Sequence, residues 1–252
     1  MSVLPVNIFL QPGQKATTLT VTNQGSNSTA IQIRAYAWSQ KDGEDELTAS
    51  DDVVVSPPIA TIAAGATQVV RLILRQQAAG QEGTYRILVD QIPPPAEPGI
   101  VHIVLRLSIP VFAQPTVRAA SHVQFHVERK DGKLFLVGVN DGNSHDVIRD
   151  IALTTTDKVK LMGESGASPY ILAGATRRWP IALPASQPPP AASQPVPTAA
   201  QPPAAVPQPV PATVPQPLPA ASQSVPTVES FQLTAHSTSG AIAQQVSAVA
   251  GP

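Results

Sequence analysis

The sequence predicts an all-β protein built from two β-sandwich domains, and three observations support this. Short segments in which apolar and polar residues alternate fill most of the chain, and turn-forming residues separate them. Helical periodicity is scarce. One proline-rich stretch interrupts the second series of segments, so we expect it to lie outside both sandwiches.

The first part of the chain carries about seven strand-like segments, the number typical of an immunoglobulin-like sandwich. They are residues 3–10, 17–22, 31–38, 53–55, 67–75, 84–91 and 100–111. Turn signals such as Gln11-Pro12-Gly13 and Lys41-Asp42-Gly43 lie between them. We therefore expect one immunoglobulin-like domain over residues 1–115.

A second series of strand-like segments follows residue 115. It comprises residues 122–128, 134–140, 147–154, 158–162 and 177–183, with two more segments near 228–236 and 242–246. These predict a second immunoglobulin-like sandwich. The boundary at Ala113-Gln114-Pro115 leaves little room for a flexible linker, so we expect the two domains to sit at a fixed angle.

Residues 184–227 differ in composition from the rest of the chain. They hold 15 of the 28 prolines and neither a charged residue nor a glycine. Proline lacks an N–H donor and fixes φ, so we expect disordered, extended polyproline II segments here. Because strand-like segments resume afterwards, we predict a loop inserted in the second domain, which then comprises residues 116–183 and 228–252. The alternative is a linker to a short tail.

Composition and charge exclude several classes of protein. The formal net charge of −1 favours neither nucleic acid nor an acidic membrane surface as the main partner. Without cysteine, the chain has no disulfide, no thiolate zinc site and no cysteine nucleophile. No apolar run is long enough for a membrane span, and the first residues do not resemble a secretory leader. The chain is therefore either cytoplasmic or the mature form of an exported protein.

The sequence contains no group of residues typical of a catalytic or cofactor site. It lacks a nucleophile elbow, a phosphate-binding loop and a zinc-protease motif. His122 and His126 share one strand face, but no third metal ligand follows at a useful spacing. The acidic turn at 42–45 is typical of a solvated surface, with a weak calcium site as the alternative. We expect no enzyme activity, no cofactor and no metal, and we assign Trp38 and Trp179 to core packing.

Several segments, in order, resemble the periplasmic chaperones of the chaperone–usher pathway. The clearest are QPGQK at 11–15, LTVTN at 19–23, VSPPI at 55–59, YRILVDQIPP at 85–94, LRLSIPVF at 105–112 and RRWP at 177–180. Together they cover most of the chain outside the insert. The SIPVF ending at 108–112 is most similar to the archaic, divergent branch of these chaperones.

The resemblance implies a periplasmic protein that binds, folds and caps pilin subunits by donor-strand complementation. A pilin is an immunoglobulin-like fold without its last strand, and the last strand of the chaperone's first domain fills the open groove. The implied partners are pilin subunits, in one-to-one complexes, and an outer-membrane usher; self-association through the exposed strand stays open. The alternative function is a surface or structural interaction module with a proline-rich spacer.

The segment 100–111 predicts the donor strand through its alternation. Apolar side chains occupy one face: Val101, Ile103, Leu105, Leu107, Ile109 and Val111. The competing interpretation is that this face packs only in the domain's own core. The segment is about twice as long as a usual strand, which favours an edge where another chain can pair.

The family anchors the terminal carboxylate of the subunit with basic residues in the cleft between its domains. The expected positions carry other residues in this sequence: Asn7 or Ile8, Pro110 and Gln114. We therefore select Arg86 and Arg106 as candidates for the carboxylate anchor, because they lie on the two strands that should border the subunit. For each of them the alternative is an exposed strand arginine.

Overall fold

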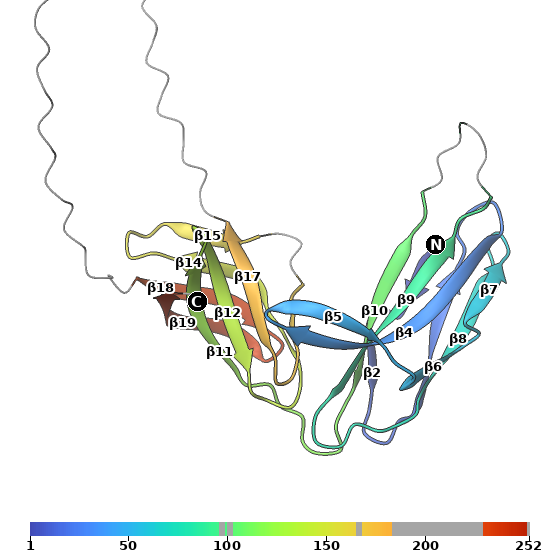
Figure 1. Cartoon of the computed structure of the whole chain (residues 1–252), viewed down its shortest axis with the longest axis horizontal. Helices are drawn as coiled ribbons and strands as arrows, with labels where there is room; N and C mark the ends of the chain where they lie inside the picture. The colour runs from blue at the N-terminus through green and yellow to red at the C-terminus, as the bar shows by residue number, and fades with distance from the viewer. Residues whose placement is uncertain (96–98, 100–102, 165–167, 183–228, 251–252) are drawn as a thin grey trace, which may run out of the picture.

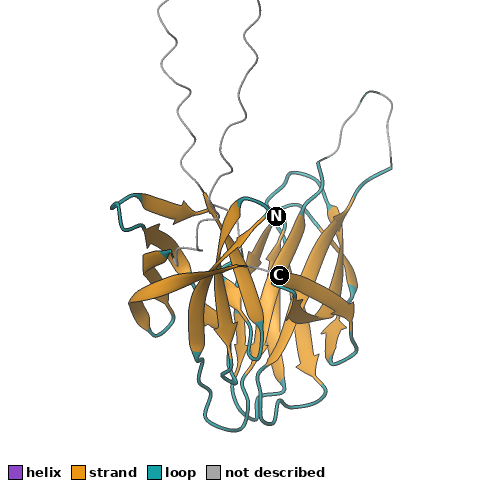
Figure 2. Cartoon of the chain, turned by 60° about the vertical axis from the view of Figure 1, so that its left-hand side comes forward, coloured by secondary structure: helices purple, strands orange, loops and turns teal. Residues whose placement is uncertain are grey.

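The structure is a computed structural model that describes residues 1–95, 99, 103–164, 168–182 and 229–250. The predicted insert, 184–227, lies outside the described residues. The described part consists of strands joined by loops and contains no helix (Figure 2). Within it, accordingly, no helix is long and apolar enough to cross a membrane. The prediction of an all-β fold is confirmed.

Two sheets form the first domain (Figure 1). One has the order β1 (Ser2–Leu4), β3 (Ala16–Thr22), β8 (Thr67–Leu74) and β6 (Val53–Ser56). The other has the order β2 (Ile8–Leu10), β10 (Arg106–Ala113), β9 (Gly83–Ile92), β4 (Thr29–Lys41) and β5 (Glu44–Ala49), and β7 (Ile59–Ile62) also pairs with β4. Alternate residues of both sheets, including Leu19, Ile33 and Val89, meet in one buried core.

Seven strands of the second domain close into a barrel. Their order is β11 (Val123–Lys130), β12 (Lys133–Asn140), β17 (Thr176–Ala182), β15 (Lys160–Gly163), β14 (Arg149–Thr154), β18 (Ser230–Ser237) and β19 (Gly240–Ala250). The parallel pairing of β19 with β11 completes the ring. Trp179 is buried in its core with Leu136 and Leu153, and a short pair, β13 (Asp146–Val147) and β16 (Tyr170–Ile171), lies beside it.

The two domains repeat one corner, both in sequence and in hydrogen bonding. The segment IAAGAT at 62–67 corresponds to ILAGAT at 171–176. Next to the first copy, the side-chain amide of Asn23 donates to three main-chain carbonyls, those of Asn27, Ile62 and Ala63. Asn140 donates in the same way to the carbonyls of Ser144, Ile171 and Leu172. Each buried asparagine thereby fixes the end of one strand against the following corner. The sequence analysis did not identify this repeat.

Some predicted strands need correction. The segment 3–10 forms two strands in different sheets, because Pro5 has no N–H to continue a ladder. The strands β5, β7 and β16 were not predicted, since their short or polar sequences lack a strong alternation. In β5 every residue is exposed.

The predicted donor strand is shorter than expected. β10 has eight residues and begins at Arg106, so the length argument for a strand over 100–111 was wrong. Its partner β9 continues to Ile92, and the Gln91 N–H still donates to the Leu105 carbonyl at 2.9 Å, one position before β10 begins. Residues 103–105 precede β10 and belong to no strand, and residues 100–102 lie outside the described part.

The β4–β5 hairpin reaches from the first domain to the second (Figure 1). Its tip is a tight turn in which Asp42 and Gly43 both have positive φ. The carbonyl oxygen of Asp42 accepts a hydrogen bond from Arg178 Nη1 at 2.8 Å, and that of Gly43 accepts one from Arg177 Nη1 at 3.0 Å. These bonds tie the hairpin to β17, so the two domains share polar contacts well away from the connecting chain.

Candidate functional site

β10 is an edge strand over most of its length. On one side it pairs with β9 from Arg106 to Ala113, whereas on the other side β2 covers only Val111 to Ala113. No strand of the described residues pairs with the outer side of 106–110. The main-chain groups on that side are therefore available to an added strand.

Alternation decides which main-chain groups of β10 face outward. The Leu105 carbonyl accepts a hydrogen bond from β9, so the main-chain N–H and C=O groups of the odd-numbered residues of β10 point towards β9. The main-chain groups of Arg106, Ser108 and Pro110 therefore point away from β9, to the open side of the strand. Pro110 has no N–H, and an edge strand tolerates that loss on its open side. A proline at this position thus leaves the ladder with β9 intact.

The predicted donor residues are divided between the domain core and the solvent. Ile109 and Val111 are buried in the core of the first domain, and Leu107 packs partly against it. Leu105 is 43% exposed and Ile103 is 86% exposed. Val101 lies outside the described residues. The C-terminal half of the segment therefore packs in the core of its own domain, while apolar side chains at the upstream end are exposed to solvent.

The exposed end borders a groove of about 740 Å³. Ile103 and Val104 line this groove together with Ile92 and the prolines that follow it, and residues of the polar loop at 23–30 also line it. Contiguous exposed apolar side chains on a soluble domain commonly mark an interaction site. Burying each of them in a partner would contribute about 1.5–3 kcal/mol.

Arg86 lies where the two domains meet. Its guanidinium carbon is 3.7 Å from the ring centre of Trp38 and 5.4 Å from that of Tyr170 in the second domain. Burial lowers the pKa of Arg86, and the charge of Asp45 opposes that shift, although Asp45 itself is ion-paired with Arg177 at 3.3 Å. Among the described residues Arg86 forms no ion pair. A half-buried cation that lies over two rings and has no ion pair among the described residues is suited to an incoming anion.

The same junction offers a second unused donor. The indole N–H of Trp38 is buried and has no acceptor among the described residues. A buried donor without an acceptor costs about 1–3 kcal/mol unless a ligand or water satisfies it. Nearby, the Tyr170 hydroxyl donates to Asn7 Oδ1 at 3.2 Å, so Asn7 helps to hold the aromatic ring that Arg86 approaches. Sequence analysis assigned Trp38 to core packing and missed Tyr170, because the contact joins residues of different domains.

Arg106 occupies a different place from Arg86. The register pairs Arg86 with Pro110 but Arg106 with Asp90, so the two arginines are four positions apart along the ladder. Arg106 Nε donates to one oxygen of Asp90, and Arg34 Nη2 donates to the other at 2.7 Å. Burial alone would raise the pKa of the Asp90 carboxyl, but the hydrogen bonds from the two arginines lower it below its usual value. The two predicted anchor candidates therefore do not form one site.

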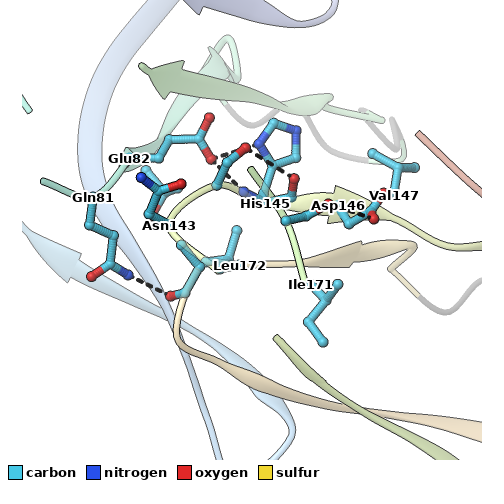
Figure 3. A network of polar contacts seen from close by, with 12 residues as sticks. Gln81, Glu82, Asn143, His145, Asp146, Val147, Ile171 and Leu172 are labelled. Atoms are coloured by element: carbon cyan, nitrogen blue, oxygen red, sulfur yellow. Dashed lines mark hydrogen bonds and ion pairs between the residues drawn. The ribbon is translucent and has the colours of Figure 1, made fainter. Parts of the chain in front are cut away.

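A buried carboxylate joins the domains beside the end of β10 (Figure 3). Glu82 Oε2 lies 2.6 Å from His145 Nδ1 and accepts the backbone N–H of His145 at 2.9 Å. The two side chains are 2% and 10% exposed. The His145 ring stacks on Phe112 with 3.6 Å between ring centres, and Gln81 Nε2 donates to the carbonyl of Ala173 at 2.6 Å. These contacts hold the C-terminal end of β10 against the second domain.

The comparisons agree with this architecture. Residues 1–118 match the family described as "Pili and flagellar-assembly chaperone, PapD N-terminal domain". Among curated protein sequences, no relative matches this chain.

Solved structures share the fold at low identity. A chain of the CsuC–CsuE chaperone–tip adhesion subunit pre-assembly complex, from the archaic chaperone-usher Csu pili of Acinetobacter baumannii, has a TM-score of 0.61 at 19% identity, covering 100% of this chain and 99% of that one. The E. coli chaperone DraB has a TM-score of 0.52 at 16% identity, covering 99% and 96%. A chain of the Salmonella enterica SafA pilin–SafB chaperone complex has a TM-score of 0.53 at 15% identity, covering 71% and 82%. At these identities the similarity concerns the fold alone.

Proposed function

Because residues 1–118 belong to the family of pili and flagellar-assembly chaperones, we propose that this chain is a periplasmic chaperone that caps pilin subunits by donor-strand complementation. The observation that carries the proposal is the open edge of β10, which continues upstream into the exposed apolar residues 103–105. The chaperone forms one-to-one complexes with pilin subunits and delivers them to an outer-membrane usher.

We assign different roles in strand donation to different residues of the segment 101–111. The outward main-chain groups of 106–110 bond an edge strand of the subunit, which supplies affinity without regard to sequence. Val101, Ile103, Leu105 and Leu107 fill the apolar groove of the subunit, and Ile109 and Val111 keep the strand attached to its own domain. The core thus holds the strand in an extended form before the subunit arrives, which lowers the entropy that binding must overcome.

The anchor that we propose for the terminal carboxylate of the subunit is Arg86. It is a cation at the domain junction without an ion-pair partner among the described residues, and the unsatisfied indole N–H of Trp38 is a second donor in the same place. A carboxylate there would receive charge-assisted hydrogen bonds and offset the desolvation of the guanidinium.

The division into domains remains part of the proposal. We assign residues 1–115 to the first domain and 116–183 with 228–252 to the second. Residues 184–227 are assigned to a proline-rich insert. What supports the insert is that β17 and β18, which precede and follow it, both belong to the same barrel.

The function is tested by co-purification from the periplasm. The chain, with a secretion signal, is co-expressed with the pilin encoded nearest to it, and the variant Ile103→Ser/Leu105→Ser is compared with Ile59→Ser/Val69→Ser, which changes similarly exposed residues elsewhere in the same domain. We expect a one-to-one complex with the wild type and the control and none with the 103/105 variant. Absence of a complex, or equal yield from all three chains, would favour the surface-module alternative.

The anchor is tested by combining a change in the chaperone with one in the subunit. Arg86→Gln should weaken capture by about 2–5 kcal/mol, because the carboxylate is left buried without its charge partner. A subunit extended by one residue displaces the carboxylate and should lose a similar amount. If Arg86 is the anchor, the two losses overlap instead of adding. Arg129→Gln, which removes an exposed ion pair in the second domain, is the matched control.

A further inference from the structure

We propose that Arg34, Asp90 and Arg106 form a second electrostatic contact, which selects subunits with an acidic side chain about four residues before the C-terminus. The inference rests on the proposed function and adds a preference for one kind of subunit sequence. It starts from the ion pairs on the sheet face that carries Arg86 and follows from the register of β9 and β10.

The three residues carry an excess of positive charge. Two guanidinium groups share the single carboxylate of Asp90, each through one nitrogen. Each guanidinium has five N–H donors, so most of them are left for another acceptor. Arg106 is 64% exposed beside the open edge of β10, whereas Arg34 lies on β4, on the far side of β9. The set is therefore prepared to accept one more anion.

The register fixes where that anion belongs on a bound subunit. Pro110 lies opposite Arg86, and Arg106 lies opposite Asp90. With its terminal carboxylate at Arg86, the last strand of the subunit runs back along the open edge of β10 towards Arg106, parallel to β10. Four residues of strand span about 13 Å and return to the same face of the sheet. The side chain about four residues before the end therefore lies next to Arg106.

A purely structural role is the alternative. Arg106 lies directly opposite Asp90 in the ladder, and Arg34 lies diagonally across from Asp90 on β4; such charge pairs stabilise sheets on their own. The two roles differ in what they predict for ligands. If the three residues have only a structural role, the affinity for a bound strand should not depend on its charge. If they form a contact site, the affinity should depend on the charge of one residue of the ligand.

The test uses peptides of about 12 residues, enough to run along β10 and the chain before it. Alternating valine–serine peptides with a free C-terminal carboxylate carry Glu, Gln or Lys at the fourth position before the last residue, and an amidated peptide serves as the reference for anchoring. Fluorescence anisotropy measures their binding to the full chain and to Arg106→Gln, Arg106→Glu and Asp90→Asn. Arg129→Glu is the matched control, because its ion pair with Glu229 lies in the second domain.

We expect the wild type to bind the Glu peptide about threefold to fivefold more tightly than the Gln peptide, and the Lys peptide least, at low salt. In Arg106→Gln the three peptides should bind equally, and Arg106→Glu should bind the Lys peptide most tightly. Asp90→Asn should bind the Glu peptide over the Gln peptide by a larger factor than the wild type does. High salt should reduce the differences in affinity between the peptides for every chain that shows them. If the three peptides bind equally while amidation still abolishes binding, the second contact is wrong and the proposed function stands. If no free-carboxylate peptide binds and no pilin co-purifies, both proposals fail.

Discussion

At the residue scale, the site departs from the pattern that the chaperone resemblance implies at the positions where basic residues are expected. Asn7 accepts a hydrogen bond from the Tyr170 hydroxyl, and Pro110 lacks an N–H donor on the open side of β10. Neither residue can supply the positive charge that a buried carboxylate needs. Arg86 can, because the ring of Trp38 on the neighbouring strand β4 and the second-domain ring of Tyr170 hold the guanidinium at the junction.

Sequence reasoning selected Arg86 and Arg106 together because both lie on strands next to the expected partner. It could not separate them, since their differences are tertiary. Arg106 faces Asp90 across the ladder, whereas Arg86 faces Pro110 and two aromatic rings that are distant in the chain. The contact of a cation with a ring from another domain leaves no local signal in the sequence.

Two carboxylates should make the stability of the protein depend on acid pH. Burial would raise the pKa of Glu128, but Arg178 Nε at 2.9 Å and His126 Nε2 at 3.2 Å lower it, as Arg106 and Arg34 lower that of Asp90. A carboxyl with a lowered pKa stabilises the folded state above its unfolded value of about 4, and the gain is lost as pH falls through the folded pKa. Between about pH 7 and pH 3, the free energy of unfolding should therefore decrease less in Asp90→Asn and in Glu128→Gln than in the wild type.

Urea unfolding at several pH values measures this difference. Glu46→Gln is the control, because Glu46 is an exposed residue of β5. The assignment would be contradicted if the free energy of unfolding of Asp90→Asn and of Glu128→Gln changed with pH as steeply as that of the wild type.

At the element scale, β10 combines two roles that the sequence presents as one pattern. Alternation alone predicts the same face for all six apolar residues, and that part is consistent with the burial of Ile109 and Val111. It cannot indicate where along the segment the domain's own core ends. Burial indicates that point: Ile109 is buried, whereas Leu105 and Ile103 are exposed even though β9 continues to Ile92 beside this part of the chain.

The two ends of this segment should therefore respond differently to the same substitution. Ile109→Ser or Val111→Ser removes buried apolar volume and buries a hydroxyl, so we expect a loss of about 2–5 kcal/mol in the free energy of unfolding. Ile103→Ser should change it by less than about 0.5 kcal/mol, because its side chain is exposed. Urea denaturation of the isolated protein measures both, and a large loss from Ile103→Ser would contradict the division of the segment.

The repeated corner illustrates how context changes an element. Leu172 in the second domain is buried with Trp38 and Phe112 at the junction, whereas its counterpart Ala63 in the first domain is exposed. The shared hydrogen bonds of Asn23 and Asn140 keep the corner in one shape in both places. Of these two copies, the one with the larger apolar side chain, Leu172, is the one that another domain covers, which explains why the two corners differ at this position.

At the scale of the whole molecule, composition and alternation predicted two β domains but not how they join. Contacts at several places connect them, among them the hairpin tip at Asp42 and Gly43, the buried pair Glu82–His145, and the rings around Phe112. All of them pair residues that are far apart in the chain. The short boundary gave an expectation of a fixed angle, and these contacts supply a physical basis for it.

Phe112 is the best single residue for testing whether the domains behave as one unit. It is fully buried at the end of β10, where it contacts Trp38 of its own domain and stacks on His145 of the other. Phe112→Ala should cost about 3–5 kcal/mol and loosen the junction, so that a single calorimetric transition separates into two. Phe231→Ala, in the core of the second domain, should lower the transition without dividing it. One unchanged cooperative transition in Phe112→Ala would mean that the hairpin and Glu82 hold the domains together without the aromatic stack, and the rigid presentation of β10 would then depend on them.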